Sequence, residues 1–298
     1  MRPSPFKLFL GLLYAFAFVA IAQLAWEGLS YYGTPLIERP RHEDFWSLKP
    51  GGSRGHLYGV IGSSLLVIML VYSLRKRVKI LRRLGKLRDW LDFHIFCGVV
   101  GPLLVILHSS FKVQGLVALS FWSMIAVALS GVLGRYLYLQ IPRTRAGDEL
   151  SLAEVEELRA ELTRKLRDEL HLPEATLAEL DRIALGGIAP IAPEKRRLAI
   201  LLFRLPFQAV SLRMRLLSFR RRLQRELAGA PRGLLRDVTR LARQKALLER
   251  RIVLWSRLQQ LFHYWHVFHK PFAVVMYVFM VIHIAVALLT GYGWSSEP

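Results

Sequence analysis

Long apolar stretches with few charged residues recur along the 298-residue chain. About 20 apolar residues are enough for an α-helix to cross the hydrocarbon core of a bilayer. Five stretches meet this condition, and polar or basic segments separate them. We therefore expect an all-α integral membrane protein with a bundle of five transmembrane helices. The predicted helices are Phe6–Trp26, Leu57–Leu74, Leu91–Lys112, Leu116–Leu139 and Val267–Leu289.

The first apolar stretch also has features of a secretory signal peptide. Arg2 and Lys7 lie near its start, and an Ala-Ile-Ala sequence at residues 20–22 is typical of a cleavage site. Its apolar run is long for a signal peptide. We therefore favour an uncleaved anchor helix.

The segment between the fourth and fifth apolar stretches has a different pattern. Leucine and valine recur at helical spacing in residues 151–170, and Asp148 or Ser151 could cap that helix. The segment contains no Gly-rich phosphate-binding loop. We predict a helical insertion whose arginines contact anionic lipid or a partner subunit. The expected division is therefore residues 1–140 with four membrane helices, a helical insertion at 141–260, and 261–298 with the fifth helix and a tail. Within the insertion, a basic amphipathic run at 201–227 and a last helix at about 231–261 are expected.

The positive charge of the chain, formally +20, predicts its orientation. The segment Arg75–Arg88 contains eight lysines and arginines and no acidic residue. Because cytoplasmic loops are enriched in basic residues, this loop (about 75–90), the N-terminus and residues 141–260 are expected in the cytoplasm of a bacterial-type inner membrane. The loop 27–56 and the C-terminus are then periplasmic. This topology accounts for the charge, so no nucleic-acid partner is expected.

The single cysteine, Cys97, limits the redox chemistry that the chain can support. One cysteine cannot form a disulfide within the chain, and neither a Cys-ligated iron–sulfur cluster nor a CxxCH haem attachment is available. Any haem must therefore be bound without a covalent link, through histidine.

Four histidines lie in two of the predicted helices, in two pairs with one spacing. His94 and His108 are 14 residues apart, and so are His269 and His283. This interval is about four helical turns, or about 21 Å, so each pair shares one helix face inside the bilayer. In the predicted topology the third and fifth helices run in the same direction. His94 and His269 are then near the cytoplasmic side, and His108 and His283 near the periplasmic side.

Two histidine pairs at matching depths predict two b-type haems, each ligated by two imidazoles. His94 and His269 are the predicted ligands of the cytoplasmic-side iron, and His108 and His283 those of the periplasmic-side iron. Small residues on the third helix would let the macrocycles approach the backbone, and basic residues would bind their propionates. These cofactor-binding candidates are Gly98 and Gly101, with Arg135 for the inner haem and Lys112 for the outer haem.

Other histidines compete for these roles. Only His269 repeats the 14-residue interval, so His263 and His266 are expected at the membrane interface, where His266 could contact a haem edge. His56, at the outer end of the second helix, is a candidate contact for the outer haem or for a quinone. Quinone is therefore the second candidate cofactor.

The segments DFHIFCGVVGPLLVILHSS and HVFHKPFAVVMYVFMVIHIAVALL resemble those of dihaem membrane cytochromes b. The pattern is similar to respiratory cytochrome b subunits and more so to the ferric-reductase/NADPH-oxidase-like transmembrane domain, in which the third and fifth helices carry the ligands. The likeness covers roughly residues 75–138 and 260–294. It implies haem ligation by the four histidines. The chain departs from these enzymes in its insertion and in having only a few residues after the fifth helix.

These observations predict transmembrane electron transfer by the membrane subunit of an oxidoreductase or respiratory complex. The chain lacks a nucleotide-binding site, so we expect redox partners: a quinone or a cytoplasmic reductase on one side and a periplasmic acceptor such as a c-type cytochrome on the other. Two alternatives are a membrane anchor or scaffold whose basic domain docks a partner, and a metal-ion transporter. A transporter predicts carboxylates or broken helices within the spans. The predicted spans contain almost no carboxylate apart from Asp92, at the edge of one.

Overall fold

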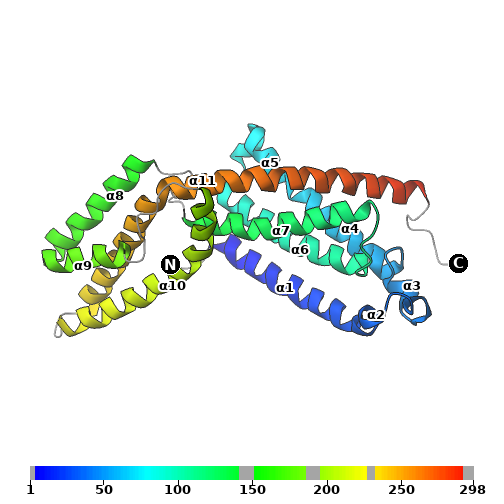
Figure 1. The fold of residues 1–298 in the computed structure, drawn as a ribbon, viewed down its shortest axis with the longest axis horizontal. Helices are drawn as coiled ribbons and strands as arrows, with labels where there is room; N and C mark the ends of the chain where they lie inside the picture. Colours follow the sequence, from blue (N-terminus) through cyan, green and yellow to red (C-terminus); the bar gives the residue numbers. More distant parts are fainter. Residues whose placement is uncertain (1–3, 141–150, 186–194, 227–231, 291–298) are drawn as a thin grey trace. The chain divides into compact units, whose positions relative to one another are not determined.

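The computed structural model describes residues 4–140, 151–185, 195–226 and 232–290, and these residues form helices without any strand (Figure 1). The chain divides into two compact units. Unit 1 contains residues 1–135 and 265–298, and unit 2 contains residues 136–264. The sequence-based boundaries are 140/141 and 260/261.

Among the described residues, five helical stretches are long and apolar enough to cross a membrane. Each one overlaps a helix predicted from the apolar pattern, which confirms the all-α class and the five membrane-length helices. The stretches are Pro5–Glu27 (α1), Phe45–Arg77 (α3 to α5), Leu87–Ser109 (α6), Val117–Gln140 (α7) and Arg257–Leu289, the last part of α11 (Arg232–Leu289).

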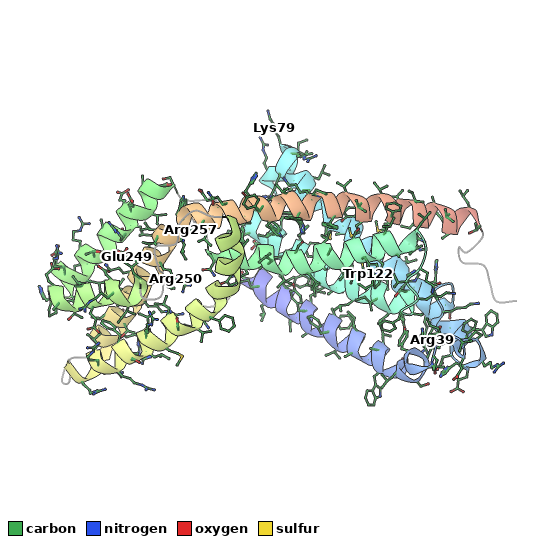
Figure 2. All side chains as sticks on the ribbon, in the orientation of Figure 1. Arg39, Lys79, Trp122, Glu249, Arg250 and Arg257 are labelled. Atoms are coloured by element: carbon green, nitrogen blue, oxygen red, sulfur yellow. The ribbon has the colours of Figure 1, made fainter. Side chains whose placement is uncertain are left out.

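The connection between α1 and α6 is more structured than a simple hairpin of two spans. The segment that follows α1 forms several short helices, and Arg39 from one of them donates a hydrogen bond to the Ser110 carbonyl oxygen at the end of α6. Arg39, labelled in Figure 2, is 7% exposed. These elements are α2 (Leu29–Gly33), η1 (Arg39–Arg41), α3 (Phe45–Leu48), α4 (Ser53–Ile68), α5 (Leu70–Arg77) and η2 (Ile80–Arg83).

The second membrane-length stretch is interrupted at Met69. The sequence predicts one helix there, whereas α4 ends at Ile68 and α5 begins at Leu70. The Met69 carbonyl oxygen lies 3.0 Å from Nδ1 of His94, in α6. Helices commonly break where a side chain forms a hydrogen bond with a backbone carbonyl oxygen and so competes with the helix's own i→i−4 hydrogen bonds.

The core of unit 1 lies between α1, α4, α6, α7 and the last part of α11. Helix α4 packs along α6, and α1 contacts α6. Cys97, in α6, is 0% exposed and packs within this core. Small residues allow the close approach of α4 and α6: a Cβ at Gly62 would lie 3.0 Å from the Gly101 carbonyl oxygen.

The outer faces of these helices carry large apolar side chains. Phe16 in α1 is 72% exposed, and Trp122 and Leu129 in α7 are 62% and 67% exposed (Trp122 is labelled in Figure 2). Water would strongly disfavour so many exposed apolar side chains, whereas lipid tails would solvate them. The faces are therefore suited to contact membrane lipid.

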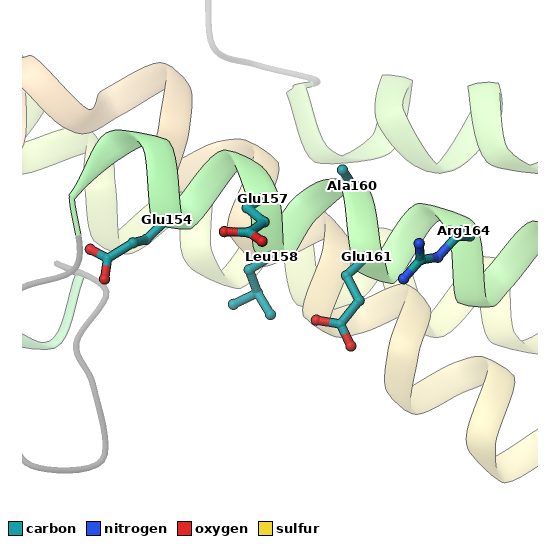
Figure 3. A pocket seen from close by; sticks show the side chains of 6 residues that line it. All are labelled: Glu154, Glu157, Leu158, Ala160, Glu161 and Arg164. Atoms are coloured by element: carbon teal, nitrogen blue, oxygen red, sulfur yellow. The ribbon is translucent and has the colours of Figure 1, made fainter.

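The first helix that lies wholly within unit 2 starts with a cap, as predicted. Ser151 and Glu154 form a capping box at the start of α8 (Leu152–Arg164), which confirms Ser151 as the cap, whereas Asp148 lies outside the described residues. Figure 3 shows Glu154 and Glu161 with their neighbours along one side of this helix. The remaining elements are a π-helical turn at Lys165–Glu169 (η3), α9 (Glu174–Leu185), α10 (Lys195–Glu226) and the first part of α11.

The main core of unit 2 is built by η3, α9, α10 and α11. Leu180, Phe219 and Val238 are buried within it, at 0%, 4% and 0% exposure. Lys245 is also buried, and its ammonium group contacts the carboxylates of Asp181 and Glu249. A buried cation needs such partners because burial removes its hydration.

Candidate functional site

The structure brings the four histidines of the 14-residue pattern together as two pairs, both within unit 1. His108 in α6 faces His283 in α11: their ring centroids are 6.3 Å apart and their planes are inclined at 60°. Two imidazoles that bind one metal ion from opposite sides, each through a nitrogen about 2.0 Å from the metal, have centroids roughly 6 Å apart. The His108–His283 pair therefore has a separation suited to one shared iron.

The ring of His108 is held by α4. Its Nδ1 lies 2.9 Å from the Gly55 carbonyl oxygen. A carbonyl oxygen can only accept a hydrogen bond, so Nδ1 carries the proton and Nε2 keeps the lone pair that a metal would use. Gly59 makes room for the ring, because a Cβ at that position would lie 2.6 Å from Nδ1.

The other pair, His94 in α6 and His269 in α11, lines one cavity of about 180 Å³. Its wall is mostly apolar, and α4, α6, α7 and α11 contribute to it. Three methionines line it, and their flexible thioether side chains can change shape at low cost. Besides the two histidines, the wall includes Met69, Met124, Met276, Gly98, Gly131 and Arg135.

Both histidines at this cavity have their Nδ1 atom next to an oxygen. Nδ1 of His94 lies 3.0 Å from the Met69 carbonyl oxygen, and Nδ1 of His269 lies 2.7 Å from Oγ of Ser130. Ser130 donates its own proton to the Val127 carbonyl oxygen at 2.9 Å, so its Oγ accepts from His269. Both rings therefore have Nε2 as the nitrogen with a lone pair, as metal-ligating histidines do.

An aromatic residue packs against His269. The ring of Trp265 lies 4.8 Å from that of His269, and its indole N–H donates to the Ser130 carbonyl oxygen at 2.7 Å. Gly134 in α7 accommodates the indole, because a Cβ there would lie 2.2 Å from a ring carbon. Trp265, on the same helix as His269, and Ser130 and Gly134 in α7 together fix the ring of His269.

Arg135, predicted to bind propionates, lines the cavity and forms an ion pair. Its Nη2 atom is 2.9 Å from Oδ1 of Asp92, and the two side chains are 27% and 11% exposed. The pairing compensates a charge that would be costly in an apolar environment. An anionic group at the cavity would meet a guanidinium that already contacts one carboxylate.

The predicted glycines have different surroundings. Gly98 lines the cavity beside His94. Gly101 is not among the residues that line it. A Cβ at Gly101 would lie 3.2 Å from the Gly62 carbonyl oxygen, so this glycine allows α6 and α4 to approach closely. Gly131 in α7, which the sequence reasoning missed, lines the cavity, and no neighbouring atom lies within 4 Å of an added Cβ.

The remaining predicted contacts do not line the cavity. Lys112 is exposed just after α6, and His56 is half-buried in the first turn of α4. His266 is half-buried against Trp265, with ring centroids 4.5 Å apart. His266 is not among the residues that line the cavity at His94 and His269, whereas Lys112 and His56 were predicted at the other histidine pair, which this cavity does not include.

A cap close to His108 was also missed by the sequence reasoning. Tyr32 donates to the Leu107 carbonyl oxygen at 3.4 Å, and burial raises the pKa of its phenol to about 12. The guanidinium of Arg39 donates to the carbonyl oxygens of Ser110 and, at 2.8 Å, of Thr34. Because these partners are backbone atoms, no motif in the sequence marks them. The cap fixes the end of α6 two residues beyond His108.

The donor set fits a haem better than a bare metal ion. In the ranges that the structure describes, no three His, Cys, Asp or Glu side chains form a group that could hold a metal ion. A haem iron has four porphyrin ligands and takes only axial ligands from the protein, and two imidazoles supply both of these. No family model, no curated protein and no solved structure matches this chain.

Proposed function

We propose that this protein transfers electrons across a membrane through two b-type haems, each ligated by two histidines. The observation that carries the proposal is the pairing of the four histidines, with His108 and His283 at a ring separation of 6.3 Å and His94 and His269 at one cavity. A haem with two imidazole ligands supplies reversible one-electron transfer and has no open coordination position for a substrate.

The residues around each pair have a defined task in this proposal. Three of the four rings are oriented by a hydrogen-bond acceptor at Nδ1, which also makes Nε2 a better electron donor. These acceptors are the Met69 carbonyl oxygen for His94, the Gly55 carbonyl oxygen for His108 and Oγ of Ser130 for His269. Gly98 and Gly131 leave open the space that a flat macrocycle needs beside His94 and His269. The cavity of about 180 Å³ is smaller than most ligand pockets, so binding would displace the methionines that line it.

The Asp92–Arg135 pair supports a haem at the His94–His269 cavity. The guanidinium of Arg135 is suited to a haem propionate, because a guanidinium can donate two parallel hydrogen bonds to one carboxylate. Asp92 would keep that guanidinium in place at its present distance of 2.9 Å. At the other haem, His56 lies next to Gly55, whose carbonyl oxygen contacts the ring of His108.

In the proposed orientation the basic segment Arg75–Arg88 and unit 2 are cytoplasmic, and the segment 27–56 is periplasmic. His94 and His269 then hold the haem nearer the cytoplasm. Electrons would pass between a quinone or a cytoplasmic reductase and a periplasmic acceptor such as a c-type cytochrome. The protein would act as the membrane subunit of such an oxidoreductase.

An absorption spectrum of the purified full-length protein tests the proposal. We expect reduced-minus-oxidised bands of b-type haem and about two haems per chain by pyridine haemochrome, as two bis-histidine sites require. His108→Ala and His94→Ala should each remove about one haem. His263→Ala, which changes an exposed histidine outside both pairs, should keep both. A folded but colourless protein from haem-replete cells would contradict the proposal and favour an anchor or transporter.

A further inference from the structure

The surface of α10 in unit 2 carries an apolar stripe that no described residue covers. Phe207, Val210, Met214 and Leu217 are 77%, 55%, 64% and 53% exposed. Their spacing of three or four residues puts all four on one face of the helix. We call this face the α10 stripe.

The α10 stripe is not the face by which α10 contributes to the core of unit 2. Phe219 and Leu223 are 4% exposed and pack against residues of α9 and α11. At about 100° per residue, these two positions are roughly opposite the stripe on the helix. Helix α10 is therefore apolar on two faces, and the core of unit 2 buries only one of them.

Arginines flank the stripe. Arg213 and Arg220 lie along one edge of it, Arg221 continues it beyond Leu217, and all three are exposed. None of these three arginines forms an ion pair among the described residues. Over the whole of α10, from Lys195 to Glu226, the sequence has ten basic residues and one acidic residue.

An apolar stripe with flanking arginines has the chemistry of helices that lie in the plane of a membrane surface. The apolar residues would enter the boundary between headgroups and acyl chains, and the arginines would contact anionic headgroups. The chain itself holds α10 within reach of a bilayer, because membrane-length helices precede and follow the segment that contains it. An acidic protein could match the arginines, but it would leave unexplained why the stripe itself is apolar.

We propose that the α10 stripe docks on the anionic lipid surface of the membrane that the five apolar helices would cross. The docking uses Phe207, Val210, Met214 and Leu217 as the inserted side chains and Arg213, Arg220 and Arg221 as the contacts to headgroups. It involves none of the four paired histidines, so it stands or fails independently of haem binding.

Lipid quenching of a fluorophore on the stripe tests this docking in the full-length protein. Met214→Cys is labelled with an environment-sensitive dye, and Cys97, which is 0% exposed, is shielded from the reagent. The unsubstituted protein measures any labelling of Cys97. Gln244→Cys, at an exposed position of α11 in the same unit, is the matched control. The proteins are reconstituted in nanodiscs of brominated phosphatidylcholine with or without brominated phosphatidylglycerol.

We expect the bromines to quench the label at Met214 in nanodiscs with phosphatidylglycerol and less in those without it. The label at Gln244 should stay unquenched in both. High salt should weaken the quenching, since it screens arginine–headgroup attraction. The double variant Arg220→Gln/Arg221→Gln should lower the ratio of docked to undocked protein on the order of 20-fold.

Three outcomes would overturn the docking. One is a Met214 label that stays unquenched in anionic nanodiscs. If aqueous iodide also fails to reach that label, the stripe is covered by protein. The second is equal quenching at Met214 and Gln244, which would reflect only the nearness of unit 2 to the bilayer. The third is quenching at Met214 that does not depend on phosphatidylglycerol.

Discussion

At the scale of single residues, the histidine pairs depend on small and polar neighbours in α4 and α7. Gly59 provides the space for the ring of His108, and Gly134 provides the space for the indole that packs on His269. Ser130 is the one side chain that accepts a hydrogen bond from a paired histidine through Nδ1 among the described contacts. If the two proposed haems are bound, substitutions at these positions should therefore affect one haem site and spare the other.

Gly59→Ala should remove the haem at His108 and His283. The new Cβ would lie 2.6 Å from Nδ1 of His108, and the ring cannot retreat without losing its hydrogen bond to Gly55. We expect the haem content to fall to about one per chain, because overpacking of a tight site moves side chains out of position. Pyridine haemochrome measures the content, and Gly11→Ala in α1, where an added Cβ meets no atom within 4 Å, is the control. Loss of both haems or of neither would contradict this assignment of Gly59.

Ser130→Ala should raise the reduction potential of the haem at His94 and His269. Loss of the acceptor at Nδ1 makes His269 a weaker electron donor, and a weaker donor stabilises the ferric state less. The free energy of one net hydrogen bond corresponds to a shift on the order of 20–60 mV for a one-electron couple. Spectroelectrochemical titration resolves the two haems, and Ser130→Thr, which keeps the hydroxyl, should restore the potential. A shift confined to the other haem would show that Ser130 has a different role.

At the scale of elements, the apolar pattern predicts where the helices lie but not where a contact with a neighbouring helix interrupts one of them. The sequence from Leu57 to Leu74 contains no charged residue and no proline, so nothing local marks the break at Met69. The break accompanies a contact with His94, which is 25 residues away in the chain. Gly59 and Ser130 were missed for the same reason, because each contacts a histidine of another helix.

The histidine pairs themselves could be predicted because equal spacing on two helices needs no knowledge of packing. The interval between His94 and His108 matches that between His269 and His283, and helices that run in the same direction bring equal intervals into register. The cap on Ser151 was also predictable, since the preference for serine at a helix start is local. Features that depend on one side chain meeting a distant backbone atom, such as Arg39 on Ser110, were not.

The first turn of α8 should become less stable against local unfolding at acidic pH. Ser151 donates from its backbone N–H to Glu154 at 2.6 Å and from its hydroxyl at 2.7 Å, and these hydrogen bonds lower the pKa of the Glu154 carboxyl. A carboxyl with a lowered pKa stabilises the fold above its ordinary pKa of about 4.3, and that contribution is lost as the pH falls through the lowered value. The protection factor of amides in the first turn of α8, which corrects the measured hydrogen exchange for the intrinsic rate at each pH, should therefore fall below about pH 4.

Glu154→Gln is the matched variant for this pH dependence. Glutamine keeps the capping geometry but does not titrate, so the protection factors of the first turn of α8 should show no acid-induced fall in this variant. Ser151→Ala should accelerate exchange there about five- to tenfold at neutral pH, because the cap is lost. Identical pH profiles for Glu154→Gln and the unsubstituted protein would assign the titration to another group.

At the scale of the whole molecule, the distribution of charge predicts a sidedness that labelling can test. The segment Arg75–Arg88 should lie in the cytoplasm and the segment 27–56 in the periplasm. Lys79 and Glu43 are exposed representatives of the two segments (Lys79 is labelled in Figure 2). Cys97 is fully buried, so a cysteine introduced at either position is the one accessible thiol among the described residues.

A membrane-impermeant maleimide should label Glu43→Cys in intact bacterial cells. It should label Lys79→Cys only after the inner membrane has been opened, because the positive-inside bias puts that loop in the cytoplasm. A gel shift measures both reactions, and the unsubstituted protein is the background control. Labelling of Lys79→Cys in intact cells, with protection of Glu43→Cys, would invert the proposed orientation and exchange the sides of the two haems.

The anchoring of the histidine rings has a consequence for heritable variation. Two of the acceptors, at Met69 and Gly55, are backbone carbonyls, which every amino acid provides, whereas Ser130 acts through its side chain. A point mutation can remove or replace the hydroxyl of Ser130 in one step. The carbonyl oxygens of Met69 and Gly55 change position only if the path of α4 or α5 changes. Selection could therefore adjust the electron affinity of the site at His269 gradually through α7, while the rings carried by α6 stay constant across generations.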